Sequence, residues 1–113
     1  MNGTLLRFYV HENRKHEHVL LYEWLLEAAR RLGIPGGTAF RAIAGYGRHG
    51  VLHEEHFFEL AGDVAVAVDL AVTADEGDRL LALLGDAGID IFYVRIPVEY
   101  GITGGPGAGA ESR

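Results

Sequence analysis

The chain has 113 residues, a formal net charge of -6, 49% hydrophobic and 23% charged residues, and no cysteine. This length fits one domain with a single core, and the composition is that of an ordinary globular protein. The lack of cysteine excludes disulfides, thiolate metal sites and thiol nucleophiles, and the negative charge argues against a broad nucleic-acid interface. No apolar run reaches the roughly 18 residues of a membrane span. The N-terminus lacks the features of a secretory signal, so we expect a cytoplasmic protein.

The first half of the chain predicts a strand, a helix and a second strand. Residues 4–11 are rich in Leu, Phe, Tyr and Val, which favours a strand. A polar connection follows over residues 11–17. From about His18 to Leu32, apolar residues recur at helical spacing, and a glycine and a proline end the helix. The second strand is predicted over about residues 38–46.

The second half predicts the same order of elements. Residues 47–56 contain two glycines and three histidines, and they are too numerous for a tight hairpin, so we expect a protruding loop. Residues 64–73 carry the strongest strand signal of the chain. A second helix starts with an acidic turn at Asp75 and ends at Gly88. The last strand is predicted over residues 91–98.

This order predicts an α+β domain with the ferredoxin-like βαββαβ fold, in which two helices cover one face of a four-stranded antiparallel sheet. The alternative is an α+β domain with the same elements and another strand order. We expect residues 1–103 to form the domain. Residues 104–113 contain four glycines and a proline, which predicts a flexible C-terminal tail.

The predicted strands are apolar on both sides. Over residues 64–72, valine and leucine alternate with three alanines and Asp69, and residues 91–98 behave similarly. Two helices cover only one face, so the other face would be a large apolar patch, which predicts closed homo-oligomerisation through the sheet. Arg41, Asp69 and Arg95 would be charged residues near that interface, with Asp69 in a salt bridge to an arginine. The alternative is a monomer that tolerates an alanine-rich face.

A family pattern runs through residues 4–102. It comprises Leu6-Arg-Phe-Tyr-Val10, Tyr22-Glu-Trp-Leu-Leu26, Gly33-Ile-Pro-Gly-Gly-Thr-Ala-Phe-Arg-Ala-Ile-Ala-Gly-Tyr-Gly47 and His53. In these segments the chain resembles the DUF190 family of PII-like signalling proteins. The most specific part is Arg41-x-x-x-Gly45-Tyr-Gly47 followed by His53. The chain departs from the pattern at Ala61-Gly-Asp-Val64, where we expect a Ser and a Leu-Pro beside the aspartate.

The resemblance implies a PII-like homotrimer of ferredoxin-like subunits. It also implies that a small anionic effector, with an adenine nucleotide as the candidate, binds in the clefts between subunits. Residues 47–56 take the place of the PII loop between the second and third strands, which engages a protein target such as a membrane transporter or an enzyme. The segment Gly85 to Val94 resembles the PII loop that holds phosphate, without that loop's lysine.

The candidate ligand-binding residues are Arg41, Gly45, Gly47, Arg48 and His53. Arginine side chains and the accessible backbone N–H groups of glycines at a strand end can together bind an anion or a nucleotide. The alternative for this segment is a twisted strand end with a solvated arginine and an interface salt bridge.

The histidines of the same loop suggest a second hypothesis. His49, His53 and His56 could bind a divalent metal, because imidazole suits zinc, copper or nickel and their spacing would place them on one face of a helical turn. The chain would then resemble the divalent-cation-tolerance proteins. The alternative is a set of solvated histidines that titrate near neutral pH.

Catalytic signals are weak throughout. The sequence has no GxSxG elbow, HExxH motif or cysteine, so we predict no catalytic residue and expect a protein that is not an enzyme. The least favoured alternative is a small enzyme that uses Asp69 or a loop histidine.

Overall fold

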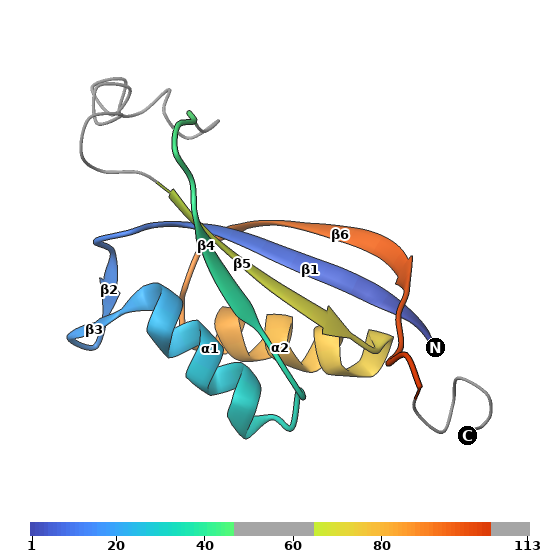
Figure 1. Cartoon of the computed structure of the whole chain (residues 1–113). Helices are drawn as coiled ribbons and strands as arrows, with labels where there is room; N and C mark the ends of the chain where they lie inside the picture. Colours follow the sequence, from blue (N-terminus) through green and yellow to red (C-terminus); the bar gives the residue numbers. More distant parts are fainter. Residues whose placement is uncertain (47–64, 105–113) are drawn as a thin grey trace.

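A four-stranded antiparallel sheet with two helices on one side forms the body of the protein (Figure 1). The computed structural model describes residues 1–46 and 65–104. Its elements are β1 (Asn2–His11), β2 (Lys15–His16), β3 (Val19–Leu20), α1 (Leu21–Arg31), β4 (Thr38–Arg41), β5 (Ala65–Val72), α2 (Ala74–Asp86) and β6 (Phe92–Glu99). Neither helix of these residues is long and apolar enough to cross a membrane.

The strands lie in the order β4-β5-β1-β6, and each pair of neighbours is antiparallel. The long central strands pair from Thr4 opposite Val72 to His11 opposite Ala65. Apart from the short β2–β3 hairpin, the chain follows the strand and helix sequence of a βαββαβ unit, with β5 inserted between β1 and β4. The predicted ferredoxin-like fold is therefore confirmed.

The core lies between the helices and one side of the sheet. Alternate residues of the central strands point to this side because side chains in a strand alternate between its two faces. The buried strand residues are Leu6, Phe8 and Val10 of β1 and Val66, Val68, Leu70 and Val72 of β5. From the helices, Leu21 and Leu25 of α1 and Leu80 and Leu84 of α2 complete the core.

The connection between the first strand and the first helix differs from the prediction. Instead of a plain polar loop, β2 and β3 form a short hairpin in which His16 lies opposite Val19. The two residues at its tip, Glu17 and His18, have φ values of 53° and 70°. A turn of this kind favours Asn-Gly, so the Glu-His pair carried no hairpin signal, and α1 starts at Leu21 rather than His18.

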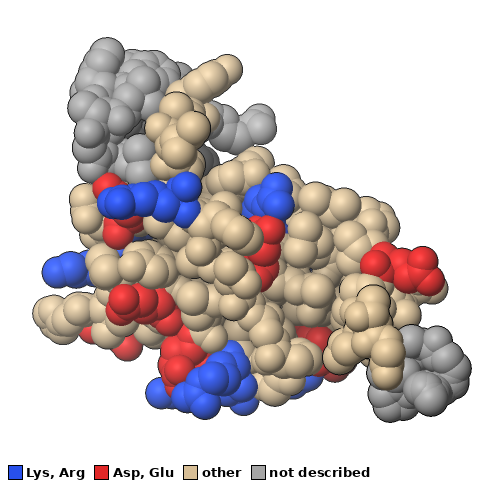
Figure 2. Space-filling view, in the orientation of Figure 1, with Lys and Arg blue, Asp and Glu red and all other residues tan. Residues whose placement is uncertain are grey.

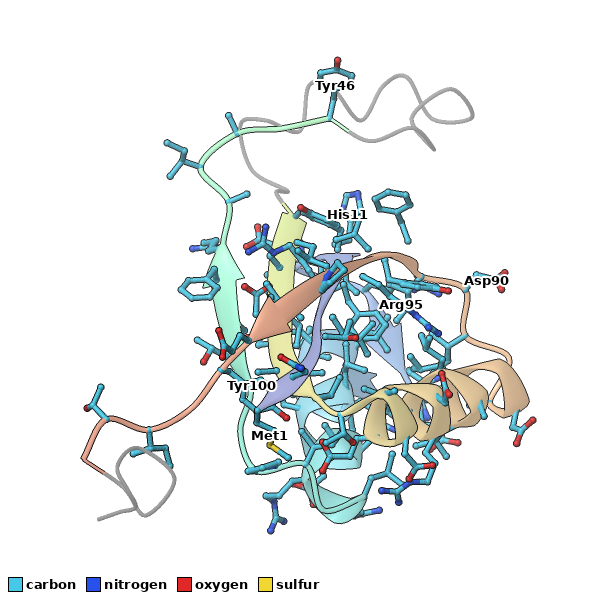
Figure 3. All side chains as sticks on the ribbon, turned by 90° about the vertical axis from the view of Figure 1, so that its right-hand side faces the viewer. Met1, His11, Tyr46, Asp90, Arg95 and Tyr100 are labelled. Carbon is cyan, nitrogen blue, oxygen red and sulfur yellow. The ribbon has the colours of Figure 1, made fainter. Side chains whose placement is uncertain are left out.

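Strand β4 is shorter than predicted. It ends at Arg41, and after a last sheet hydrogen bond from the Ala42 amide to the Ala65 carbonyl (2.9 Å) the chain leaves the sheet. Figure 3 shows Tyr46 on this extension, well away from the sheet. The predicted loop at residues 47–56 lies outside the described residues.

Candidate functional site

One face of the sheet is left open by the helices. In Figure 1 no described element covers it. By strand register it carries Leu5, Arg7, Tyr9 and His11 of β1, Ala65, Ala67, Asp69 and Ala71 of β5, Phe92, Val94, Ile96 and Val98 of β6, and Thr38 and Phe40 of β4. We call this set the open sheet face. It is mostly apolar, and among its members Tyr9, Phe40, Phe92 and Ile96 are large exposed residues.

An ion pair lies in the middle of the open sheet face. Arg7 and Asp69 are directly opposite each other on the two central strands. The Arg7 Nε donates to Asp69 Oδ1 at 2.7 Å and Nη2 donates to Oδ2 at 2.9 Å, which is a bidentate pair. The hydrogen bond to Asp69, assisted by Tyr9, raises the pKa of Arg7 above its ordinary value. The charges of this face are thus neutralised within one chain.

The structure corrects the predicted placement of two arginines. Asp69 does lie on the open sheet face and does pair with an arginine, but that arginine is Arg7. Arg95 lies opposite Leu6 on the helix side, and its Nη2 is 3.5 Å from Asp78 Oδ1 of α2. Arg41, opposite Val66, belongs to the helix side as well. The sequence analysis placed all three near a sheet interface. The register instead puts Arg41 and Arg95 on the helix side, because they lie opposite the core residues Val66 and Leu6.

Beside the last residue of β4 there is a pocket of about 420 Å³. It is lined by Glu12, Asn13, Leu20, Tyr22, Ala39, Phe40, Arg41 and Val66. We call it the β4 pocket. The β1–β2 connection, the start of α1 and strands β4 and β5 all contribute to it, so residues far apart in the sequence meet there. Its lining combines aliphatic and aromatic surface with a few polar groups, as is common in small-molecule sites.

Arg41 forms an ion pair with Glu12 inside this pocket. The Arg41 Nε donates to Glu12 Oε1 at 2.8 Å, and Nη2 donates to the same oxygen. The Glu12 side chain is only 11% exposed, whereas that of Arg41 is 71% exposed. The hydrogen bond to Glu12 raises the pKa of Arg41. The pocket therefore presents a guanidinium, which can bind an anionic group, already held by a largely buried carboxylate.

Of the other predicted site residues, Gly45 is the one within the described part of the chain. Gly45 lies on the extension beyond β4, where a Cβ atom would meet nothing within 4 Å, and it does not line the β4 pocket. Gly47, Arg48 and His53 lie outside the described residues, as do His49 and His56 of the metal hypothesis. Within residues 1–46 and 65–104, no group of three His, Cys, Asp or Glu side chains could hold a metal ion.

Sequence reasoning missed Glu12, the partner of Arg41, and other residues that line the β4 pocket. In the sequence, Glu12 and Asn13 belong to a predicted polar connection and Tyr22 to a predicted helix. No motif relates these residues to the strand that contains Arg41. The residues around Arg41 indicated a ligand site there. The contact with Glu12 was not predicted, because the two residues are 29 positions apart in the chain.

Charge on the surface is mixed in sign. Figure 2 shows basic and acidic side chains next to one another on the face in view, rather than a continuous basic surface. Within the described residues, Arg30 and Arg31 contact Glu27, and Arg79 contacts Asp75, each along one helix. Arg41 differs from these surface arginines because its carboxylate partner is largely buried and a pocket lies beside it.

The strand order and the two helices on one face define a ferredoxin-like α+β domain. The structure matches a crystal structure described as a "putative PII-like signaling protein" from Thermus thermophilus, with a TM-score of 0.52 and 19% identity. The match covers 86% of this chain and 88% of the other. At this level of identity the similarity concerns the fold.

The chain belongs to the DUF190 family, described as "Uncharacterized ACR", whose model matches residues 3–98. It is 35% identical over 80 residues to a UPF0166 protein of Aquifex aeolicus, covering 71% of this chain and 73% of that one. A UPF0166 protein of Methanocaldococcus jannaschii is 31% identical over 84 residues, covering 74% and 77% of the two chains. The family resemblance predicted from the sequence is therefore confirmed.

Proposed function

We propose that this protein is a PII-like regulatory domain that acts in the cytoplasm as a homotrimer and binds a small anionic effector between neighbouring subunits. An adenine nucleotide is the effector we favour. The signal would pass through residues 47–56 to a protein target, a membrane transporter or an enzyme. On this proposal the domain binds and signals, and we assign it no reaction. The observation that carries it is the β4 pocket, which contains Arg41 and borders the open sheet face.

The open sheet face supports assembly with further copies of the same chain. Burial of apolar surface is the main favourable term in protein association. An unpaired charge would oppose that burial, but Arg7 and Asp69 compensate each other within each subunit. Two such faces can therefore meet without repulsion between like charges. Three is the copy number that the resemblance to PII proteins implies.

Phe40 belongs to both the open sheet face and the β4 pocket. Its side chain is 55% exposed on the open sheet face, and it also lines the β4 pocket. A neighbouring subunit seated on the open sheet face would therefore reach the edge of the pocket and deepen it into a cleft. The chain that leaves β4 beside Arg41 continues directly into the segment before β5, so an effector in the cleft would lie at the base of that segment.

Calorimetric titration with ATP, ADP and AMP tests this function. We expect Arg41→Gln to weaken nucleotide binding about ten-fold or more, because a charge-assisted hydrogen bond contributes roughly 1.5–3 kcal/mol. Arg79→Gln is the matched control, since it removes an exposed arginine that pairs with Asp75 on α2.

The wild-type mass should be measured in parallel by analytical ultracentrifugation, with three times 12.3 kDa expected. A chain that remains monomeric at micromolar concentration, or that binds none of the three nucleotides at millimolar concentration, would contradict the proposal.

A further inference from the structure

The contact between Glu12 and Arg41 has a consequence for any anion that enters the β4 pocket. A site for an anion is expected to be rich in donors, yet this pocket contains a carboxylate that is only 11% exposed. That carboxylate accepts hydrogen bonds from both Nε and Nη2 of Arg41 through one oxygen. It therefore uses the two guanidinium donors that would form one side of a bidentate contact to a phosphate or a carboxylate.

Backbone hydrogen bonds order the connection that contains Glu12. It directly follows β1, and the next turn is closed by a hydrogen bond from the Arg14 amide to the His11 carbonyl at 3.1 Å. The Leu21 amide in turn donates to the Arg14 carbonyl at 2.7 Å, which ties the connection to the start of α1. By contrast, the Arg41 side chain is 71% exposed. Of the two partners, the arginine is thus the one with room to move.

We propose that Glu12 is an internal competitor that holds Arg41 until an anionic effector displaces it, and so sets the affinity of the site. This inference rests on the proposed function, because it assumes that Arg41 binds the effector's anionic group. An entering anion must replace the Glu12 contacts rather than bind an unoccupied guanidinium. Its measured affinity is then lower than the guanidinium alone would provide, by the strength of the contact that it breaks.

Two variants, each compared with the wild type, and two ligands test this inference. Binding of ATP and of inorganic tripolyphosphate is titrated calorimetrically to the wild type, Glu12→Gln and Arg41→Gln. Glutamine keeps the size of the side chain but removes the charge, so we expect Glu12→Gln to bind both ligands about ten-fold more tightly than the wild type. Arg41→Gln should bind both more weakly than the wild type.

Glu27→Gln provides the matched control. Glu27 also contacts arginines, Arg30 and Arg31, but these lie on α1 and do not line the β4 pocket. This variant changes the net charge by the same amount, so an equal gain in affinity would show that bulk charge is responsible and would overturn the inference.

The remaining outcomes separate the two claims. Weaker binding by Arg41→Gln, together with no gain by Glu12→Gln, overturns the competitor and leaves the proposed function standing. Absence of binding by all variants, Glu12→Gln included, overturns both. Thermal unfolding checks that each variant folds. If Glu12→Gln does not fold, Glu12→Asp, which is one methylene shorter, should also tighten binding, and no gain there would likewise overturn the inference.

Discussion

At the scale of single residues, Arg7 and Asp69 decide what the open sheet face can contact. The pair lies on the two central strands, among side chains that are mostly apolar. Breaking a buried pair by removing one partner leaves an uncompensated charge, which is costly, whereas apolar replacement of both partners is often neutral or stabilising. The pair therefore permits burial of the face and adds little attraction of its own.

We expect Asp69→Ala to weaken self-association, because each interface would then bury an unpaired Arg7. The cost should be about 3 kcal/mol per buried arginine, as for other buried pairs that lose one partner. Sedimentation equilibrium measures the association constant. The double variant Arg7→Met with Asp69→Leu should restore association.

Asp78→Ala is the control for this experiment. It removes the partner of Arg95 on the helix side of the sheet and should leave the association constant unchanged. A double variant as weak as Asp69→Ala would contradict the role that we give to the pair.

At the scale of elements, the two helices begin in different ways. Helix α2 has a capping box, in which the Thr73 Oγ1 accepts from the Glu76 amide at 3.1 Å and Glu76 Oε1 accepts from the Thr73 amide at 2.9 Å. Helix α1 has no side-chain cap, since its N-cap residue is Leu20. Its start is set by the hairpin and by burial of Leu21 instead.

Removal of the α2 cap should destabilise the domain. Thr73→Ala loses the hydroxyl that accepts from the Glu76 amide, and we expect the free energy of unfolding to fall by about 1 kcal/mol. Urea denaturation measures the change. Thr73→Ser keeps the hydroxyl and should be close to the wild type, and Thr103→Ala, at an exposed turn residue, should have no effect. Equal losses in the alanine and serine variants would mean that the methyl group, rather than the cap, is responsible.

At the scale of the whole molecule, the two sides of the sheet differ in what covers them. One side packs against α1 and α2 and forms the core, and the other side is the open sheet face. Contiguous apolar surface of this kind usually marks an interface. The β4 pocket lies at the border between the two sides, which is why assembly and effector binding are coupled in the proposed function.

Two substitutions on β6 test this division. Ile96 is 39% exposed on the open sheet face, and Tyr93 is 40% exposed on the opposite face of the same strand. We expect Ile96→Glu to convert the assembly to monomers, because it would place a charge in the interface. Tyr93→Glu should keep the oligomeric mass of the wild type, as measured by light scattering after gel filtration. Assembly that survives Ile96→Glu would show that the copies meet elsewhere.

Local patterns in the sequence were enough to predict the order of the elements and the apolar character of both sides of the sheet. These features depend on local signals, namely alternation with a period of two in strands, apolar spacing in helices and glycines at helix ends. The alternation of valines and alanines in β5 indicated two apolar sides, and the structure buries the valine side in the core.

Which side chains meet across strands depends on the tertiary structure. The pairing of Asp69 with Arg7, the positions of Arg41 and Arg95 on the helix side, and the contact of Arg41 with Glu12 all depend on register between segments far apart in the chain. A shift of one residue in register turns every side chain of a strand to the other face. The amino-acid pattern of a strand that is apolar on both sides does not specify that choice, so packing of the whole domain makes it.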